Sequence, residues 1–282
     1  MRTKKATLLG MILLLVVLLG ACAAPLPTPA PTPAPQPVPT DPEPEPEPIA
    51  NKGEIIMDGA VVVGGDLESI ILVDKITAVN PTFAELRNFL ASDKTDSNDY
   101  ILSFATRDRT PSYVCADFAE AIHNNAEASG IKAGFVVFDE IDHALNAFQT
   151  IDKGLIFIDS TGQFFIHTVT PPWEIAFGEP IIWDKIAYVQ KGKALGFIEL
   201  GFAPYYGFEY SGYERWLADK ALFDSKFNKY KGQVGGRESV SLTEYNRLKE
   251  QERELKEIAG RLGGFFEEKG IVQGFQIFWE GR

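Results

Sequence analysis

A run of alternating prolines constrains what this chain can fold into more than any other feature. Residues 25–48 hold most of the chain's 18 prolines, nearly one at every second position. Proline lacks an N–H group and fixes φ, so this run can form neither a helix nor a sheet. It predicts an extended polyproline II spacer of ~3.1 Å per residue, or roughly 75 Å in all. The acidic residues at 41–47 extend it further by repulsion. The sequence therefore predicts a stalk over 22–48, ahead of a globular body.

The first residues have the pattern of an export signal. A basic start within residues 2–5 precedes an apolar run over Leu8–Leu19. The run is shorter than the roughly 20 residues that a membrane span needs, but it suits a signal-peptide core. It ends in Leu19-Gly20-Ala21-Cys22, which resembles the lipobox of bacterial lipoproteins. This resemblance implies a leader over 1–21, a lipid on the Cys22 sulfur, and an extracytoplasmic protein anchored to a membrane at the cell surface or in the periplasm. The alternative is an ordinary secreted protein with a chance cysteine.

Composition excludes several classes of function. The chain has 27 basic and 39 acidic residues, giving a net charge of −12. Such a chain repels phosphate backbones, so no nucleic-acid partner is expected. Its two cysteines and three histidines rule out a disulfide framework and a zinc site built from several His and Cys ligands. We expect no cofactor and no metal.

The body predicts an α+β fold. Its helices and strands follow one another in local hairpins, without the regular βαβ alternation of a parallel sheet. We expect a core over 49–180, then a region over 181–282 that completes the sheet and adds a helical C-terminal extension. The predicted helices begin at Thr82, Cys115, Ser211 and Ser241, and the predicted strands cover 55–56, 60–63, 134–138, 143–148, 155–159, 186–190 and 195–199.

Three residues have the pattern of a nucleophile and its base. Cys115 begins a helix, where unpaired N–H groups and the helix dipole favour a thiolate. His143 begins one strand and Asp159 ends the next. A hairpin centred on residue 151 would make His143 and Asp159 cross-strand neighbours on one face. A thiol, an imidazole and an orienting carboxylate form the general layout of a cysteine nucleophile.

The same stretch resembles the transglutaminase-like superfamily. The motifs are Cys115-Ala116-Asp117-Phe118-Ala119, Gly130-Ile131-Lys132-Ala133, His143-Ala144 and Ile158-Asp159-Ser160-Thr161. They cover roughly residues 82–162. The resemblance implies a papain-like core, in which a nucleophile helix packs on an antiparallel sheet. It further implies Cys115 as nucleophile, His143 as general base and acid, and Asp159 as the orienting carboxylate.

Departures from the family pattern narrow the expected activity. Val114 and Ala116 flank the cysteine where the family often has Gly and Trp, and Leu145 replaces a common aromatic residue. We therefore expect hydrolysis of a peptide, protein or cell-envelope substrate rather than cross-linking. The Cys115 N–H is the natural first oxyanion donor, and Tyr113 is a candidate for the second.

Each of these residues also has a structural reading. Cys115 could be a buried, inert thiol in a non-catalytic binding module or a surface scaffold. His123 is expected to be structural, and His167 has no assigned role. Asp139, Glu140 and Asp142 read as a solvated acidic loop that could select basic substrates, and the aromatic segment 202–216 reads as packing. The oligomeric state stays open.

Overall fold

The computed structural model describes residues 50–101, 112–162, 184–234, 241–264 and 268–282. The predicted leader, Cys22, the proline-rich stalk, His167 and the predicted boundary at residue 180 lie outside the described residues. From residue 46 to the C-terminus the chain forms one compact unit.

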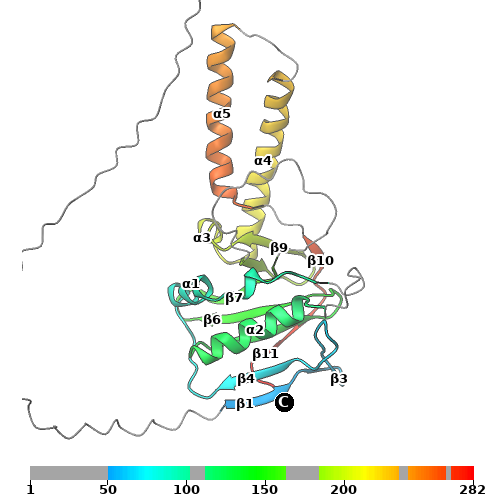
Figure 1. The fold of residues 1–282 in the computed structure, drawn as a ribbon. Helices are drawn as coiled ribbons and strands as arrows, with labels where there is room; N and C mark the ends of the chain where they lie inside the picture. The colour runs from blue at the N-terminus through cyan, green and yellow to red at the C-terminus, as the bar shows by residue number, and fades with distance from the viewer. Residues whose placement is uncertain (1–49, 102–111, 163–183, 235–240, 265–267) are drawn as a thin grey trace, which may run out of the picture. The chain divides into compact units, whose positions relative to one another are not determined.

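A seven-stranded antiparallel sheet forms the centre of this unit, in the strand order β10-β9-β8-β7-β6-β5-β11 (Figure 1). The sheet curls and combines with helices, which agrees with the predicted α+β class. Strands from both predicted regions join it, because β11 pairs with β5 and β8 pairs with β7. The strands are β5 (Gly134–Phe138), β6 (Ala144–Thr150), β7 (Gly154–Asp159), β8 (Lys185–Tyr188), β9 (Ala194–Glu199), β10 (Lys269–Ile271) and β11 (Phe275–Phe278).

Two small antiparallel pairs precede the sheet in sequence. β1 (Ala50–Glu54) pairs with β4 (Ile71–Lys75), and β2 (Ile56–Met57) pairs with β3 (Ala60–Val61). The sequence predicts the second pair but not the first. β1 has no apolar run by which a short strand is recognised. β4 does contain one, Ile71-Leu72-Val73, but this run lies outside the strands that we predict from the sequence.

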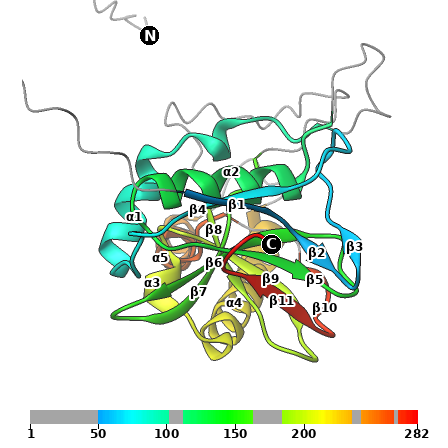
Figure 2. The same cartoon turned by 90° about the horizontal axis from the view of Figure 1, so that it is seen from below.

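Helix α2 (Cys115–Ala128) contacts strand β4 as well as strands β5 and β6 of the central sheet, and Figure 2 shows it running alongside β1 and β4. Its apolar residues face the core, while three polar side chains one turn apart bond to strand β4. Oxygens of Glu120, Asn124 and Glu127 accept the N–H groups of Ile71, Val73 and Lys75 at 2.8, 2.8 and 3.0 Å. The helix thereby satisfies the edge of β4 that has no strand partner. Gly130, at φ +82°, ends this segment as predicted.

Of the other helices, α1 precedes the strands of the central sheet in the chain, and α3, α4 and α5 lie between β9 and β10. A capping box at Thr82 starts α1 as predicted: Thr82 Oγ1 accepts the Glu85 N–H, and the Glu85 carboxylate accepts the Thr82 N–H. Among the described helices, none has the length and apolar character needed to cross a membrane. The bounds are α1 (Phe83–Ser92), the 3-10 turn η1 (Thr95–Ser97), α3 (Ala203–Tyr206), α4 (Tyr210–Val234) and α5 (Leu242–Leu262).

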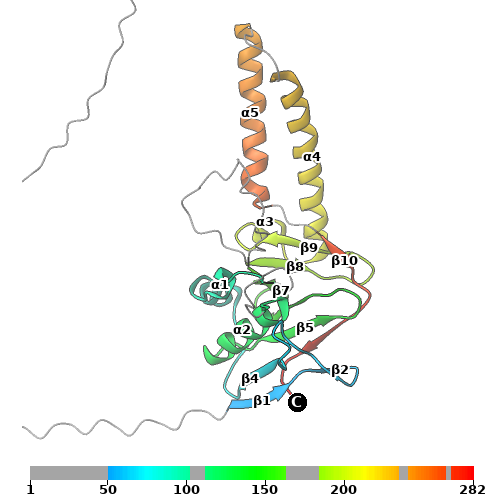
Figure 3. The same cartoon turned by 45° about the vertical axis from the view of Figure 1, so that its right-hand side comes forward.

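Helices α4 and α5 form an antiparallel pair, visible in Figures 1 and 3. Trp216 Nε1 donates to the Leu262 carbonyl at 2.9 Å, and the Lys226 ammonium bonds to Glu254 at 2.7 Å. The aromatic segment around Trp216 is core packing, as expected. The helical spacing of Tyr213, Trp216, Leu217 and Phe227 predicts that all four are buried, but Phe227 is 43% exposed. Away from the sheet, each of these two helices packs, among the described residues, against the other helix alone. This contact buries one face of each helix and leaves the rest of its surface exposed.

Candidate functional site

Cys115 is the first residue of α2, as the sequence predicts. The Asp117 carboxylate fixes this turn, because it accepts the Val114 N–H at 2.6 Å and the Gly65 N–H at 2.9 Å. A side chain at Gly64 would overlap that carboxylate, so the Gly64-Gly65 break allows the loop to approach the helix closely. Cys115 is a free thiol, 7% exposed.

His143 and Asp159 meet in the core of the unit. His143 Nε2 lies 3.0 Å from Asp159 Oδ2, and both side chains are almost fully buried. Buried Asn146 Nδ2 donates to the Ala119 carbonyl at 2.8 Å. This bond ties α2 to β6, the strand that begins directly after His143. Cys115 and His143 therefore come from two elements that are locked to each other.

The predicted hairpin centre is off by one residue, which shifts the cross-strand pairing by two. β6 and β7 pair Thr150 with Gly154, so the turn is centred on residue 152 rather than 151. The turn takes this length because Gly154 adopts a positive φ of 74° and Thr150 Oγ1 accepts the Lys153 N–H. Asp159 consequently lies diagonal to His143 rather than opposite to it. The residues keep the same face, since the period along each strand is two.

The Asp159 carboxylate is held as an anion. Burial alone would raise its pKa, but buried Lys185, with Nζ 3.6 Å from Oδ1, His143 and the Thr161 N–H at 2.8 Å outweigh this effect. The pKa of Asp159 therefore lies well below its ordinary value. Lys185 also donates to the Thr161 carbonyl at 3.1 Å.

His143 is oriented by one nitrogen and leaves the other available. Among the described residues, no group forms a hydrogen bond with Nδ1. Burial would lower the pKa of His143, but Asp159, through its charge and its hydrogen bond, and the nearby Cys115 thiol raise it overall. The raised pKa means that the site favours a protonated imidazole beside the carboxylate.

Cys115 and His143 line the same cavity, whose volume is about 460 Å³. Its apolar wall includes Val62 and Val114. The acidic residues Asp139, Glu140 and Asp142 also line this cavity. The predicted acidic loop therefore borders the same cavity as the Cys115 thiol. The negative charge of this loop would favour a substrate with basic groups.

The structure does not bring Tyr113 to this cavity. Its hydroxyl points to the Asp117 carbonyl at 3.5 Å, and its side chain lines a separate groove with Asp66 and Glu120. Tyr100, which no sequence pattern singles out, packs against the buried cluster that contains Cys115. Burial, then the Cys115 thiol, raises the pKa of Tyr100 to about 12, so the phenol keeps its proton.

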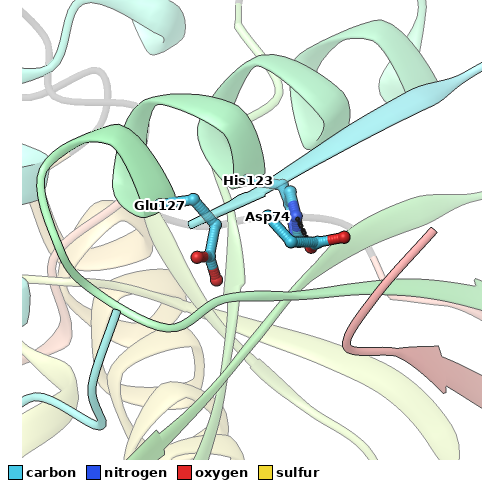
Figure 4. A group of neighbouring side chains, drawn as sticks. All are labelled: Asp74, His123 and Glu127. Atoms are coloured by element: carbon cyan, nitrogen blue, oxygen red, sulfur yellow. Dashed lines mark hydrogen bonds and ion pairs between the residues drawn. The ribbon is translucent and has the colours of Figure 1, made fainter. Parts of the chain in front are cut away.

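No sequence pattern marks Lys185 and Asp184 as part of the site. Lys185 is the first residue of β8 and Asp184 directly precedes it, far along the chain from Asp159. The Ser160 hydroxyl donates to Asp184 Oδ1 at 2.6 Å, and burial raises the Asp184 pKa to about 7. The predicted structural His123 lies away from the Cys115 cavity, in a buried group with Asp74 and Glu127 (Figure 4).

Comparison of the chain with protein-family models, curated proteins and solved structures finds no match. Its function is therefore inferred from its own residues.

Proposed function

We propose that this protein is a cysteine hydrolase of the transglutaminase-like type, with a papain-like core, that cleaves peptide or carboxamide bonds. One observation carries the proposal: Cys115, at the first residue of α2, shares a cavity with a His143 that is paired with buried Asp159. In keeping with the lipobox-like leader, we propose that the protein acts outside the cytoplasm, anchored to a membrane through Cys22.

The chemistry follows from which nitrogen is free. The Cys115 thiol gives its proton to His143 Nδ1, and the thiolate attacks the substrate carbonyl carbon. The C–N bond then breaks, the imidazolium protonates the leaving amine, and an acyl thioester remains on Sγ. Water attacks the thioester while His143 takes its proton, which releases the acid and restores the thiol. Asp159 stays ionised and holds the imidazole in position throughout.

The acidic wall of the cavity indicates the kind of substrate. Asp139, Glu140 and Asp142 would attract a peptide or amine carrying positive charge near the scissile bond. The chain is strongly acidic elsewhere as well, so this preference is specific only if it is lost when the loop is neutralised. A triple variant that combines Asp139→Asn, Glu140→Gln and Asp142→Asn should raise KM for a lysine-containing amide and leave an uncharged amide unaffected.

The deciding experiment is the rate of Cys115 alkylation by iodoacetamide as a function of pH. A thiolate supported by an imidazolium should react rapidly at pH 6, where a free thiol with a pKa near 8.5 is almost fully protonated. His143→Ala should remove the reaction at pH 6, and Cys115→Ser should remove the fast labelling assigned to residue 115. Labelling followed by peptide mapping separates Cys115 from Cys22.

The low exposure of the thiol favours one alternative, a non-catalytic binding module on the same fold. Cys115 is 7% and His143 4% exposed. If Cys115 stays unreactive until the protein unfolds, the hydrolase proposal is wrong. The cavity is then a non-catalytic binding site, or Cys115 is an inert residue of the hydrophobic core.

A further inference from the structure

A second chemically distinct cluster lies where the C-terminal half of α2 meets β4, and Cys115 at the start of the same helix is not part of it. Asp74 on β4 and His123 and Glu127 on α2 each offer a ligand atom, and these atoms lie within 4.8 Å of one another. All three residues are buried. Figure 4 shows the two helix side chains directed toward the strand that bears Asp74.

The spacing of the helix residues suits a shared ligand. His123 and Glu127 are four residues apart, so they lie on the same face of α2, one turn from each other. That face packs on β4, where Asp74 is buried against it. One imidazole and two carboxylates from two rigid elements make a preorganised donor set.

His123 contributes the observation that points to a ligand. Its side chain is fully buried, and Nε2 lies 3.1 Å from Asp74 Oδ1. Among the described residues, no group forms a hydrogen bond with His123 Nδ1. Nδ1 needs a partner that the described residues do not supply, whereas Nε2, which faces Asp74, is the nitrogen that an ion shared with Asp74 would bind.

The charge of the cluster is only partly compensated, because His123 is the one basic side chain among the described residues that pairs with either carboxylate. Two buried carboxylates lie here, and no lysine or arginine in the described part of the chain forms an ion pair with either. Buried anions of this kind are normally paired or coordinate a metal.

The carboxylates are also oriented as metal ligands usually are. The two Glu127 oxygens accept the Ala133 and Lys75 N–H groups at 2.9 and 3.0 Å, and Asp74 Oδ2 accepts the Gly281 N–H at 3.1 Å. Each oxygen keeps a further lone pair. Outer bonds of this type fix ligand geometry in metal sites. A cavity of about 340 Å³, which Asp74 and Glu127 line together with Lys132 and Glu280, gives a route to the cluster.

We propose that Asp74, His123 and Glu127 bind one divalent transition-metal ion of the zinc class. An imidazole ligand beside carboxylates favours zinc and similar transition metals over magnesium and calcium, which are bound through oxygen ligands. The ion clamps α2 to β4 and, through Asp74, to the C-terminal segment at Gly281. It therefore stabilises the helix that bears Cys115 without contacting the thiol.

The test is zinc binding to the purified protein, free of affinity tags, by equilibrium dialysis and by the change in Tm. The protein should hold one equivalent of zinc, and its Tm should fall when a chelator removes the ion. Glu127→Gln should weaken binding by more than the roughly 10- to 100-fold that loss of an outer-shell partner costs. Because His123→Gln could also unfold the chain, Glu127→Gln and Asp74→Asn are the deciding variants.

Two controls make the outcome unambiguous. Glu120→Gln alters a carboxylate that caps a β4 N–H in the same way, at 2.8 Å, but lies outside the cluster; it should bind zinc like wild type. Cys115→Ser should also keep its zinc, which excludes binding at the thiol. The proposal is overturned if the wild type holds well under one equivalent, if Glu120→Gln and Glu127→Gln lose zinc equally, or if Cys115→Ser abolishes binding.

Discussion

The His143 imidazole bonds to Asp159 through Nε2, across a diagonal of the β6–β7 pair, at 3.0 Å. This choice of nitrogen has a chemical consequence. Nδ1, the nitrogen nearer the backbone, makes no hydrogen bond to any described residue and is left for the thiol that shares its cavity. The Asp159 carboxylate thus fixes the imidazole ring through Nε2, while Nδ1 remains available to exchange a proton with the thiol.

Asp159→Asn tests the charge of that anion with little change in shape. The amide can keep a hydrogen bond to His143, but it no longer stabilises an imidazolium. Turnover of any accepted substrate should fall by about 10²–10⁴-fold, and alkylation of Cys115 at pH 6 should slow. Folding is checked by circular dichroism. Unchanged rates in a folded variant would remove Asp159 from the mechanism.

Lys185→Met tests the buried partner of Asp159. Breaking a buried ion pair leaves the remaining charge uncompensated, and the expected loss of stability is about 3–5 kcal/mol. The matched control is Lys193→Met, which breaks a half-exposed pair with Glu214 and should cost less than about 1 kcal/mol. Urea denaturation at pH 7 measures both. Equal losses would show that Lys185 contributes no more than a surface lysine.

The two tyrosines near α2 can be compared directly as oxyanion donors. Tyr100 packs with the Cys115 cluster, whereas Tyr113 lines a separate groove. If Tyr100 donates to the oxyanion, Tyr100→Phe should lower kcat by up to about 10²–10³-fold, and Tyr113→Phe should have little effect on kcat. KM should change little in either variant. The reverse pattern would restore Tyr113, and no effect in either would leave the backbone N–H of Cys115 as the main donor.

Local sequence patterns predicted much of the site. The capping box at Thr82, the helix start at Cys115 and the β6–β7 hairpin each depend on residues within one or two turns of one another. The approach of His143 to Asp159 followed from hairpin geometry, and the two-residue shift in pairing came from the turn at Gly154, whose centre lies one residue later than predicted. A turn of this kind shifts pairing without moving residues to the other face.

What the sequence did not predict depends on long-range pairing. Lys185 reaches Asp159 only because β8 pairs with β7 in a register that sets Asp159 opposite Lys185. Asp74 reaches His123 because α2 covers the free edge of β4. Neither contact can be recognised in the local sequence, because a single Lys or Asp in a strand gives the same sequence pattern whether it is buried with a partner or exposed to solvent. Helical spacing misled at Phe227, because periodicity identifies an apolar face but not whether anything covers it.

Asp117→Ala tests how the first turn of α2 positions the nucleophile. The Asp117 carboxylate holds the N–H groups of Val114 and Gly65. Its loss should cost about 0.5–2 kcal/mol and slow alkylation of Cys115. Ser241→Ala removes a comparable cap from α5, where Ser241 Oγ accepts the Glu244 N–H at 3.2 Å; it should lower stability and leave alkylation unchanged. Equal alkylation rates in the two variants would show that the Asp117 bonds are only structural.

Asp184→Asn tests the buried carboxyl next to Lys185 through pH. Burial raises the Asp184 pKa to about 7, against the opposing Ser160 hydrogen bond, whereas aspartate in an unfolded chain titrates near pH 3.9. The native state therefore binds more protons than the unfolded chain between about pH 4 and pH 7. Its contribution to stability is present at low pH and is lost as pH rises through 7.

At about pH 3, below the unfolded value, the carboxyl is protonated in both states and resembles the amide, so wild type and Asp184→Asn should have similar Tm values. At pH 8 the wild type must bury a charge that the variant lacks, and the variant should melt several degrees higher. Differential scanning calorimetry at the two pH values measures the difference. Asp224→Asn, at a half-exposed surface carboxylate, controls for general charge effects and should shift Tm little at either pH. A variant less stable than wild type at pH 8 would mean that the Lys185 ammonium pairs productively with ionised Asp184, and that burial is not the dominant influence on this carboxyl.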